Sequence, residues 1–293
     1  MPSSKKLHIS WYMLSDYLAA ALAWILFTIV RRELLREPLY KGNHLELNNR
    51  FILGIAVLPF IWLAFFFLAG SYGSLYKKSR LNEITTTFSC TLAGCIIIFF
   101  VFILNDYNHS LNYYYTALVY FILLQFMLTM AGRWLLLAIA KKQMRSGAVR
   151  FNAILAGDHK TSGRLYLHTR DQLKQSGIVY TGFVSDEKNG LSAHLPHLGK
   201  LAELEAIIDR HAIELVVIAI DDTNKKEAED LINRLGKKEV DIKIVPSILD
   251  ILAGSVKTEN VLSPVLADIS TGLIPQWQQN VKRLLDIIIS LLG

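Results

Sequence analysis

The chain has 293 residues, of which 52% are hydrophobic, and a mean hydropathy of +0.33, so it is too apolar for an ordinary soluble protein and long enough for two structural units. Its net charge of +6 arises almost entirely in residues 1–140, which carry 11 Lys and Arg against 6 Asp and Glu, whereas residues 141–293 carry 20 against 19. The nearly neutral second part argues against nucleic acid as a partner.

Four stretches in the first part are long and apolar enough to cross a bilayer as helices, which takes roughly 20 residues each. They are approximately Trp11–Val30, Phe51–Gly70, Ile84–Leu104 and Tyr115–Ile139. Because hydrocarbon offers no partner for backbone N–H and C=O groups, runs of this length should close their hydrogen bonds as helices. We therefore expect residues 1–145 to form a four-helix transmembrane domain.

Lysine and arginine residues in the short flanks predict the orientation, because cytoplasmic loops are enriched in them. Three basic flanks share one side if the N-terminus is cytoplasmic: Lys5 and Lys6, then Lys77, Lys78 and Arg80, then Lys141, Lys142 and Arg145. The loop 105–112 has neither residue type and is expected outside. The loop after the first helix does not fit this orientation, because it would lie outside although it contains Arg31, Arg32, Arg36, Lys41 and Arg50. On balance we expect the N-terminus and the second part of the chain in the cytoplasm.

Asp16 and Gln125 are the polar side chains that stand out within the predicted spans. A carboxylate inside a membrane is a functional candidate. However, Asp16 lies only about one and a half helical turns inside its span. The simpler interpretation is therefore a carboxylate that stays hydrated or pairs with Lys5 or Lys6.

From Val149 onward, short apolar runs alternate with amphipathic segments. Strands are expected at Val149–Leu155, Ile178–Val184, Ile213–Ile220 and Val240–Val245, and helices at Ser162–Gln175, Leu201–Arg210 and Asn224–Leu235. This alternation predicts a mainly parallel sheet covered by helices on both faces, so residues 146–275 are expected to form a Rossmann-like α/β domain. The continuous apolar run before Asp221 is typical of a central strand, and residues 248–279 are expected to return over the sheet as a loop-rich segment.

The strongest ligand candidate of this domain is the turn after its first strand, from Gly157 to Gly163. A glycine-containing turn that leads into a helix exposes free N–H groups and the positive end of the helix dipole, which suits a phosphate. Gly157, Lys160 and Gly163 are therefore candidate nucleotide-binding residues. The GxGxxG fingerprint is absent and Asp158 would repel an anion, so a scaffold whose nucleotide site has decayed or serves packing is the alternative.

Asp221 and Asp222 follow the third expected strand, at the edge of the sheet where ligands of open α/β folds bind. The pair is a candidate for holding a metal ion or sugar hydroxyls, and the simpler interpretation is that these residues cap the next helix. His194 and His197 lie in a predicted loop without another ligand nearby and are interpreted as surface residues.

Motifs for catalysis are missing from the sequence. It contains no GxSxG, HExxH or P-loop, and no Tyr-x-x-x-Lys pair of the kind that a sugar-nucleotide dehydratase needs. We therefore assign no catalytic and no metal-ligating residue.

The C-terminal stretch contains Lys282-Arg283-x-x-Asp286 followed by an apolar helix. This pattern resembles the start of the catalytic domain of bacterial polyprenyl-phosphate glycosylphosphotransferases, the large monotopic phosphoglycosyl transferases of capsule, exopolysaccharide and O-antigen synthesis. The order of four membrane helices, Rossmann-like domain and KRxxD helix is similar too, so the resemblance covers the whole chain.

The resemblance implies transfer of a sugar-1-phosphate from a UDP-sugar to undecaprenyl phosphate, with Mg²⁺ and a catalytic Asp-Glu pair. It also implies that residues 276–293 begin a re-entrant helix that enters one leaflet, with Lys282, Arg283 and Asp286 at the interface near lipid or substrate phosphates. Plain cytoplasmic flank charges are the alternative for the two basic residues. The catalytic pair and the proline that breaks the re-entrant helix are absent from residues 276–293, so we expect the chain to be inactive alone.

The expected function is thus the membrane-anchoring and regulatory or oligomerising part of such a transferase. It is expected in the bacterial inner membrane, in contact with lipid and as a homo-oligomer. A membrane-tethered nucleotide-sensing or scaffold protein without its own catalysis is the alternative. A sugar-nucleotide dehydratase or epimerase relative is disfavoured, because its motifs are missing.

Overall fold

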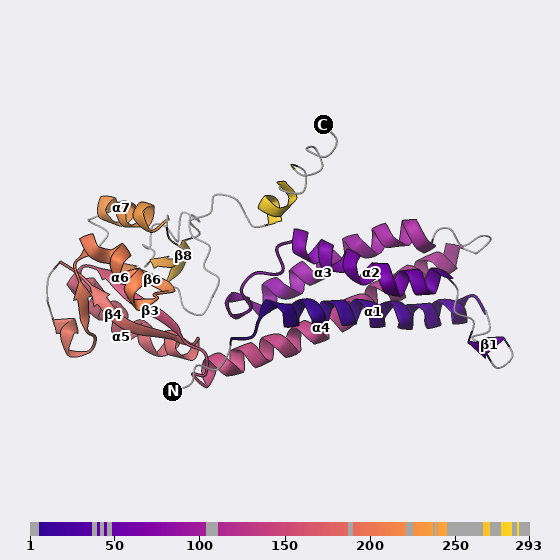
Figure 1. The fold of residues 1–293 in the computed structure, drawn as a ribbon, viewed down its shortest axis with the longest axis horizontal. Helices are drawn as coiled ribbons and strands as arrows, with labels where there is room; N and C mark the ends of the chain where they lie inside the picture. Colours follow the sequence, from indigo (N-terminus) through magenta and orange to yellow (C-terminus); the bar gives the residue numbers. More distant parts are fainter. Residues whose placement is uncertain are drawn as a thin grey trace. The chain divides into compact units, whose positions relative to one another are not determined.

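The computed structural model describes residues 6–36, 40–41, 44–45, 49–103, 111–186, 190–220, 225–236, 238, 240–244, 266–269, 277–282 and 286. The chain divides into two compact units (Figure 1). The helical unit lies within residues 6–140 and 274–293, and the α/β unit lies within residues 141–273. Each unit is described by itself.

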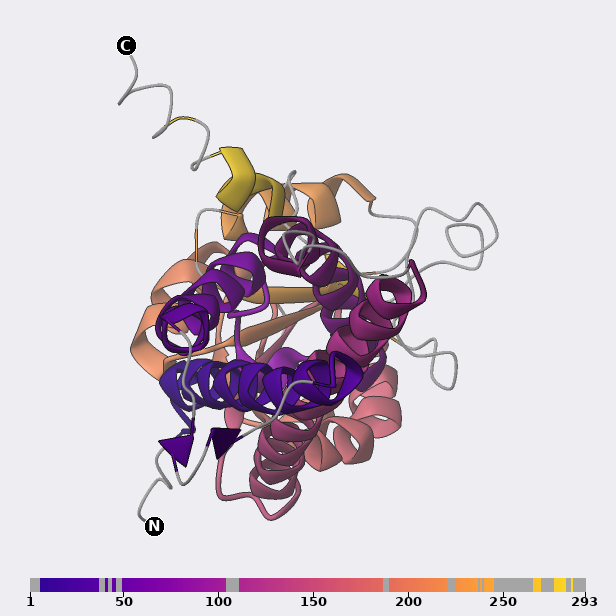
Figure 2. The ribbon, with the colours of Figure 1, turned by 90° about the vertical axis from the view of Figure 1, so that its right-hand side faces the viewer.

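The helical unit is built from α1 (Ile9–Leu34), α2 (Asn49–Leu68), α3 (Arg80–Ile98) and α4 (Leu111–Arg145). A π-helical turn, η2 (Phe99–Ile103), extends α3, and a 3-10 turn, η1 (Leu75–Lys77), lies between α2 and α3. Strands β1 (Tyr40–Lys41) and β2 (His44–Leu45) pair as a small antiparallel hairpin, visible in Figure 2 at the end of the unit that faces the viewer. All four predicted apolar spans are helices, and each is long and apolar enough to cross a membrane.

Aromatic side chains fill the centre of the helical unit. Trp24 and Phe27 of α1 pack against Phe121 of α4, with 4.7 Å between the ring centroids of Phe27 and Phe121. Glycines make room for the large rings: a Cβ on Gly94 of α3 would lie 2.6 Å from the ring of Trp62 on α2. The close approach of these helices therefore depends on a missing side chain.

The α/β unit contains one six-stranded sheet with the order β5-β4-β3-β6-β7-β8. The strands are β3 (Phe151–Gly157), β4 (Ile178–Val184), β5 (His197–Gly199), β6 (Leu215–Ala219), β7 (Asp241–Ile244) and β8 (Ala267–Ile269). Strands β3 to β7 pair in parallel, and β8 pairs with β7 antiparallel. All five residues of β6 are buried, as expected for a central strand covered on both faces.

The alternating side chains of the strands contribute to two separate cores. On one face, Ile154, Val216 and Ile218 pack with apolar residues of α6 (Leu204–His211) and α7 (Lys225–Leu235). On the other face, Leu155 and Val217 pack with α5 (His159–Gln175) and with the segment around the 3-10 turn η3 (Gly190–Ala193). The predicted α/β layering, with a mainly parallel sheet, is confirmed.

Two details differ from the sequence prediction, and others lie outside the described residues. The short edge strands β5 and β8 were not expected, because each has only three residues and no clear alternation. Strand β3 begins at Phe151 and continues to Gly157, later than predicted at both ends. The predicted helix start at Asn224, the strand end at Val245 and most of segment 248–279 lie outside the described residues.

Candidate functional site

The predicted ligand edge of the sheet coincides with its topological switch point. From β3 the chain proceeds outward through β4 and β5 and then returns to β6 on the opposite side of β3. In open α/β sheets, ligands bind at the carboxyl ends of two strands related in this way. Gly157 ends β3 here and is paired with Ala219, the last residue of β6.

Gly157 serves the contact between these two strands. Its φ angle is +139°, in a region that disfavours other residues, and a Cβ would collide with the carbonyl group of Ala219. The next residue, Asp158, donates its backbone N–H to that carbonyl at 2.9 Å. The close contact with Ala219 therefore explains why glycine is needed at position 157, and no ligand has to be invoked.

Asp158 occupies the N-terminus of α5, where a phosphate was expected. Its side chain accepts a hydrogen bond from the backbone N–H of Thr161 at 3.5 Å and another from the Thr161 hydroxyl at 3.4 Å. A carboxylate thus caps the positive end of the helix dipole. Gly163 lies in the first turns of α5, and a Cβ there would meet no atom within 4 Å. Gly163 therefore does not provide the close helix-to-strand packing of a dinucleotide-binding fingerprint.

The remaining predicted residues of this edge are only partly described. Lys160 lies in the first turn of α5, and its side chain is outside the described set. Asp221 and Asp222, two and three positions after Ala219, also lie outside it. Among the described residues, no three His, Cys, Asp or Glu side chains converge in a way that could hold a metal ion. The structure thus brings Gly157 next to the end of β6. That Asp221 and Asp222 hold a metal ion or sugar hydroxyls stays a prediction.

The two candidate histidines lie in different surroundings. His194 is exposed and stacks on the ring of Tyr166. His197 is half-buried in β5, with its Nε2 2.8 Å from the carbonyl oxygen of Ser185, so it is part of the sheet edge and not of a surface loop. Neither of them belongs to a group of three metal-ligating side chains among the described residues.

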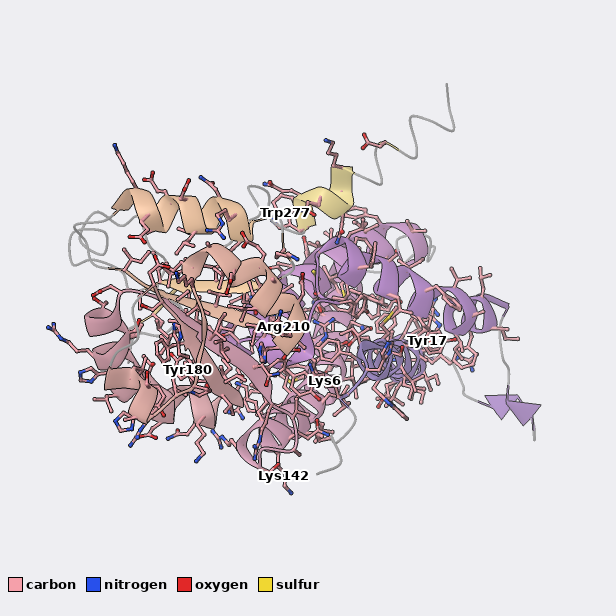
Figure 3. All side chains as sticks on the ribbon, turned by 60° about the vertical axis from the view of Figure 1, so that its left-hand side comes forward. Lys6, Tyr17, Lys142, Tyr180, Arg210 and Trp277 are labelled. Atoms are coloured by element: carbon pink, nitrogen blue, oxygen red, sulfur yellow. The ribbon has the colours of Figure 1, made fainter. Side chains whose placement is uncertain are left out.

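The C-terminal segment, residues 277–282, is helical and belongs to the helical unit. Asn280 donates a hydrogen bond from its side-chain amide to the carbonyl oxygen of Phe67 near the end of α2, at 2.7 Å. Trp277, labelled in Figure 3, and Lys282 are exposed. Asp286 is exposed as well, and Arg283 is outside the described residues. The described members of the KRxxD pattern are thus accessible to a ligand.

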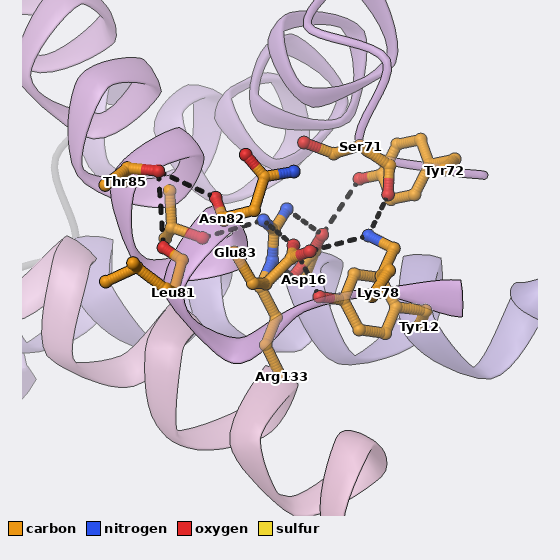
Figure 4. A network of polar contacts seen from close by, with 11 residues as sticks. Tyr12, Asp16, Ser71, Tyr72, Lys78, Leu81, Asn82, Glu83, Thr85 and Arg133 are labelled. Atoms are coloured by element: carbon orange, nitrogen blue, oxygen red, sulfur yellow. Dashed lines mark hydrogen bonds and ion pairs between the residues drawn. The ribbon is translucent and has the colours of Figure 1, made fainter. Parts of the chain in front are cut away.

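A second site, inside the helical unit, was missed by sequence reasoning. Arg133 of α4 is fully buried and donates to both oxygens of Asp16 on α1, from Nε at 3.0 Å and from Nη2 at 2.7 Å. Its Nη1 donates to Glu83 of α3 at 2.7 Å and to the hydroxyl of Thr87 at 2.8 Å. One guanidinium therefore joins three helices through charge-assisted hydrogen bonds (Figure 4).

The segment between α2 and α3 completes this group. Lys78 donates to Glu83 at 2.9 Å and also to the backbone carbonyl of Ser71. The hydroxyl of Tyr72 donates to Asp16 at 3.0 Å. Burial lowers the pKa of the Lys78 ammonium, although the Glu83 carboxylate opposes this, and burial raises the pKa of Tyr72. We call Asp16, Lys78, Glu83 and Arg133 the ionic cluster; its two cations and two carboxylates balance in sign.

The interpretation of Asp16 as a hydrated carboxylate or a partner of Lys5 or Lys6 is wrong, because Asp16 is buried and paired with Arg133. A usable signal was present in the sequence, since Arg133 is an unexplained cation inside a predicted span. Buried positions of α4 recur every four residues, which places Gln125, Thr129 and Arg133 on one interior row. The amide of Gln125 donates to Thr129 at 3.0 Å, so the predicted polar position Gln125 belongs to this row.

The fold and these sites define a class: a Rossmann-like α/β domain joined to four long apolar helices. A family model described as a CoA-binding domain matches residues 68–246, so the chain belongs to this family. The match extends from the end of α2 beyond β7 and therefore includes α3, α4 and nearly the whole sheet.

A solved structure is also similar to the chain, namely UDP-D-quinovosamine 4-dehydrogenase from Vibrio fischeri. The two share 19% sequence identity over 42% of this chain and 95% of that one, with a TM-score of 0.31. At this identity and TM-score the likeness assigns no activity. A comparison with curated proteins gives no match.

Proposed function

We propose that residues 1–293 are the membrane-anchoring and regulatory or oligomerising part of an undecaprenyl-phosphate sugar-1-phosphate transferase of the bacterial inner membrane. The N-terminus and the α/β unit would lie in the cytoplasm, and lipid would surround the helices. The observation that carries this proposal is the exposed surface of the helical unit, which is rich in large apolar side chains while an ionic cluster is buried inside.

The ionic cluster is buried in the helical unit, and many large apolar side chains are exposed on its surface. Arg133 is 0% exposed, whereas Phe60 on α2 and Leu135 on α4 are 62% and 65% exposed. Exposed apolar residues recur every four positions on α4, at Leu111, Tyr115, Val119, Leu123 and Met127. In water such an apolar surface would promote aggregation, whereas in the hydrocarbon of a bilayer it is favourable. Hydrocarbon offers no partner to polar groups, so these are expected to pair inside the helical unit.

Two features support the transferase part of the proposal. The CoA-binding-domain family occurs in bacterial proteins related to sugar transferases and NAD-dependent epimerases. In addition, Lys282 and Asp286 of the KRxxD pattern are exposed, and Asn280 links the C-terminal segment to the end of α2. A phosphate at the membrane surface would therefore find these groups accessible.

Membrane anchoring is tested by extraction of the full chain from bacterial membranes. The chain should stay in the membrane pellet through an alkaline carbonate wash and dissolve only in detergent. Release of the chain by carbonate would overturn the proposal. Cross-linking in intact membranes would test the expected homo-oligomer.

Catalysis is tested with purified residues 1–293, a UDP-sugar, undecaprenyl phosphate and Mg²⁺. We expect no undecaprenyl diphosphosugar, because the resemblance places transfer on an Asp-Glu pair that is absent from residues 276–293. No described residue is assigned to Mg²⁺. Formation of product would show that catalytic residues are present in this chain.

A second candidate function is nucleotide or CoA sensing by the α/β unit, which the family match favours. Thermal unfolding of the full chain in detergent with CoA, UDP, UDP-sugars or NAD tests this function, since a ligand at 100 times its dissociation constant adds about 2.7 kcal/mol. Asp158→Asn keeps the helix cap and removes the charge, so it should strengthen binding of an anionic nucleotide. Asp171→Asn, on the exposed face of the same helix, is the matched control.

A further inference from the structure

A cation stacked on a tryptophan lies on the outside of the contact between α3 and α4. The guanidinium carbon of Arg80, the first residue of α3, lies 5.0 Å from the ring centroid of Trp134 on α4. Both side chains are exposed, and the next residue of each helix, Leu81 or Leu135, is an exposed apolar side chain. A basic group, an indole and apolar side chains are thus grouped at the α3–α4 contact.

The ionic cluster fixes this arrangement from inside. Glu83 lies one turn after Arg80 and Arg133 directly precedes Trp134, and these two inner residues form an ion pair at 2.7 Å. Because the inner pair holds the two helices together, Arg80 and Trp134 are brought side by side on the outer surface. Stacking on a ring keeps a guanidinium plane oriented while leaving its edge free to donate hydrogen bonds.

Arg80 differs from the cations of the ionic cluster because its charge is not balanced. Arg133 and Lys78 are paired with carboxylates. Within the described part of the chain, stacking on Trp134 is the only interaction of the Arg80 side chain, and no carboxylate lies within ion-pair distance. Its donors therefore remain available for an anion, and the planar fork of a guanidinium matches a phosphate.

The position along the helices matches the surface of a bilayer. Tyr115 and Trp134, whose rings are both exposed, are nineteen positions apart on α4. At a rise of about 1.5 Å per residue this is roughly 28 Å, close to the thickness of a hydrocarbon core of about 30 Å. Tryptophan and tyrosine concentrate at the two edges of that core, where lipid phosphates lie. Trp134 would thus mark the edge nearest to Lys141 and Lys142.

We propose that Arg80 and Trp134 form a binding site for the phosphate of an anionic membrane lipid, with its acyl chains against Leu81 and Leu135. An anionic lipid is favoured over a zwitterionic one, because Arg80 has no negative partner among the described residues. This proposal rests on the proposed membrane location of the helical unit and adds a specific lipid contact to it.

The test uses the full chain in neutral detergent, titrated with phosphatidylglycerol, phosphatidylcholine or inorganic phosphate. Retained lipid is measured by native mass spectrometry, and the melting temperature gives a second readout. We expect selective binding of phosphatidylglycerol, weakened at least about tenfold by Arg80→Gln and by Trp134→Leu. Arg145→Gln removes an exposed charge from the end of α4 and should keep wild-type binding.

Two results would overturn the site. One is wild-type affinity for phosphatidylglycerol in Arg80→Gln; the other is equal competition by inorganic phosphate, which would indicate a site for free anions. Arg80→Lys, which keeps the charge without the planar fork, should bind at an intermediate level, and the melting temperature of each variant without lipid shows that it is folded. Carbonate extraction separates the lipid site from the proposed membrane anchoring. If the wild-type chain stays in the membrane but Arg80→Gln still binds the lipid, only the lipid site is refuted.

Discussion

At the scale of single residues, Arg133 is the side chain whose removal should matter most. It neutralises Asp16 and Glu83, which are both buried, and it contributes hydrogen bonds to α1 and α3. Removing one partner of a buried ion pair is far more costly than replacing both partners by apolar side chains, because the remaining charge stays desolvated without compensation. The ionic cluster is therefore expected to behave as one unit.

Arg133→Gln should lower the free energy of unfolding of the full chain in detergent by about 3–5 kcal/mol, because two carboxylates lose their main partner. Thermal unfolding followed by circular dichroism measures the effect. The double variant Asp16→Asn with Arg133→Gln should recover part of the loss, since one buried charge goes with its partner. Equal stability of Arg133→Gln and the exposed control Arg145→Gln would contradict this role.

Tyr180 gives the α/β unit a pH-dependent contribution to stability. It is buried, and burial raises its pKa to about 12 from an ordinary value of 10.0. The single proton of the Thr169 hydroxyl goes to the carbonyl of Leu165 at 2.7 Å, so Tyr180 is the donor in its 2.8 Å bond to Thr169. Ionisation of Tyr180 would therefore leave a buried charge, and the Thr169 hydroxyl could donate to it only by giving up its bond to the Leu165 carbonyl.

Because the folded state holds this proton more tightly, the stability gained from Tyr180 should be complete below pH 10 and lost as the pH rises to about 12. The loss should reach about 3 kcal/mol. Denaturant unfolding at several pH values measures it, and Tyr180→Phe should flatten the curve in this range. Tyr166→Phe, which changes the half-buried neighbouring ring, is the control; the same flattening there would refute the assignment.

At the scale of elements, the two glycines of the β3–α5 turn should respond in opposite ways to alanine. Gly157→Ala should cost about 1–3 kcal/mol, because of its positive φ and its contact with Ala219. Gly163→Ala should be neutral or stabilise α5 by up to about 1 kcal/mol, since a Cβ meets open space. Denaturant midpoints of both variants check this, and a destabilising Gly163→Ala would point to a contact outside the described residues.

The elements also show how far sequence reasoning reached. Long apolar runs gave all four helices, because length and hydropathy are local properties. The alternation of strands and helices predicted the parallel core of the sheet. The edge strands β5 and β8 could not be predicted, because three residues are too few to show an alternation of apolar and polar side chains. These strands are held in place by pairing with β4 and β7.

At the scale of the whole molecule, orientation is the testable prediction. The exposed Trp11 lies in the first turn of α1, just after Lys6, and the exposed Trp134 lies about two turns before Lys141, both toward the side expected to be cytoplasmic. In intact cells, a membrane-impermeant maleimide should label Asn108→Cys and should label Lys142→Cys only after permeabilisation. The native cysteines, Cys90 and Cys95, would be replaced first, and the reverse labelling pattern would reject this orientation.

The sequence by itself determined that the chain has four lipid-length helices and a parallel α/β sheet, because hydropathy and periodicity are written locally along the chain. Only the tertiary structure decided which polar groups meet. Asp16 and Arg133 are 117 positions apart, and their pairing depends on how α1, α3 and α4 pack. Likewise, the backbone N–H of Asp158 meets the carbonyl of Ala219 because the switch point places β6 next to β3. Contacts between distant segments depend on packing geometry, which no local pattern encodes.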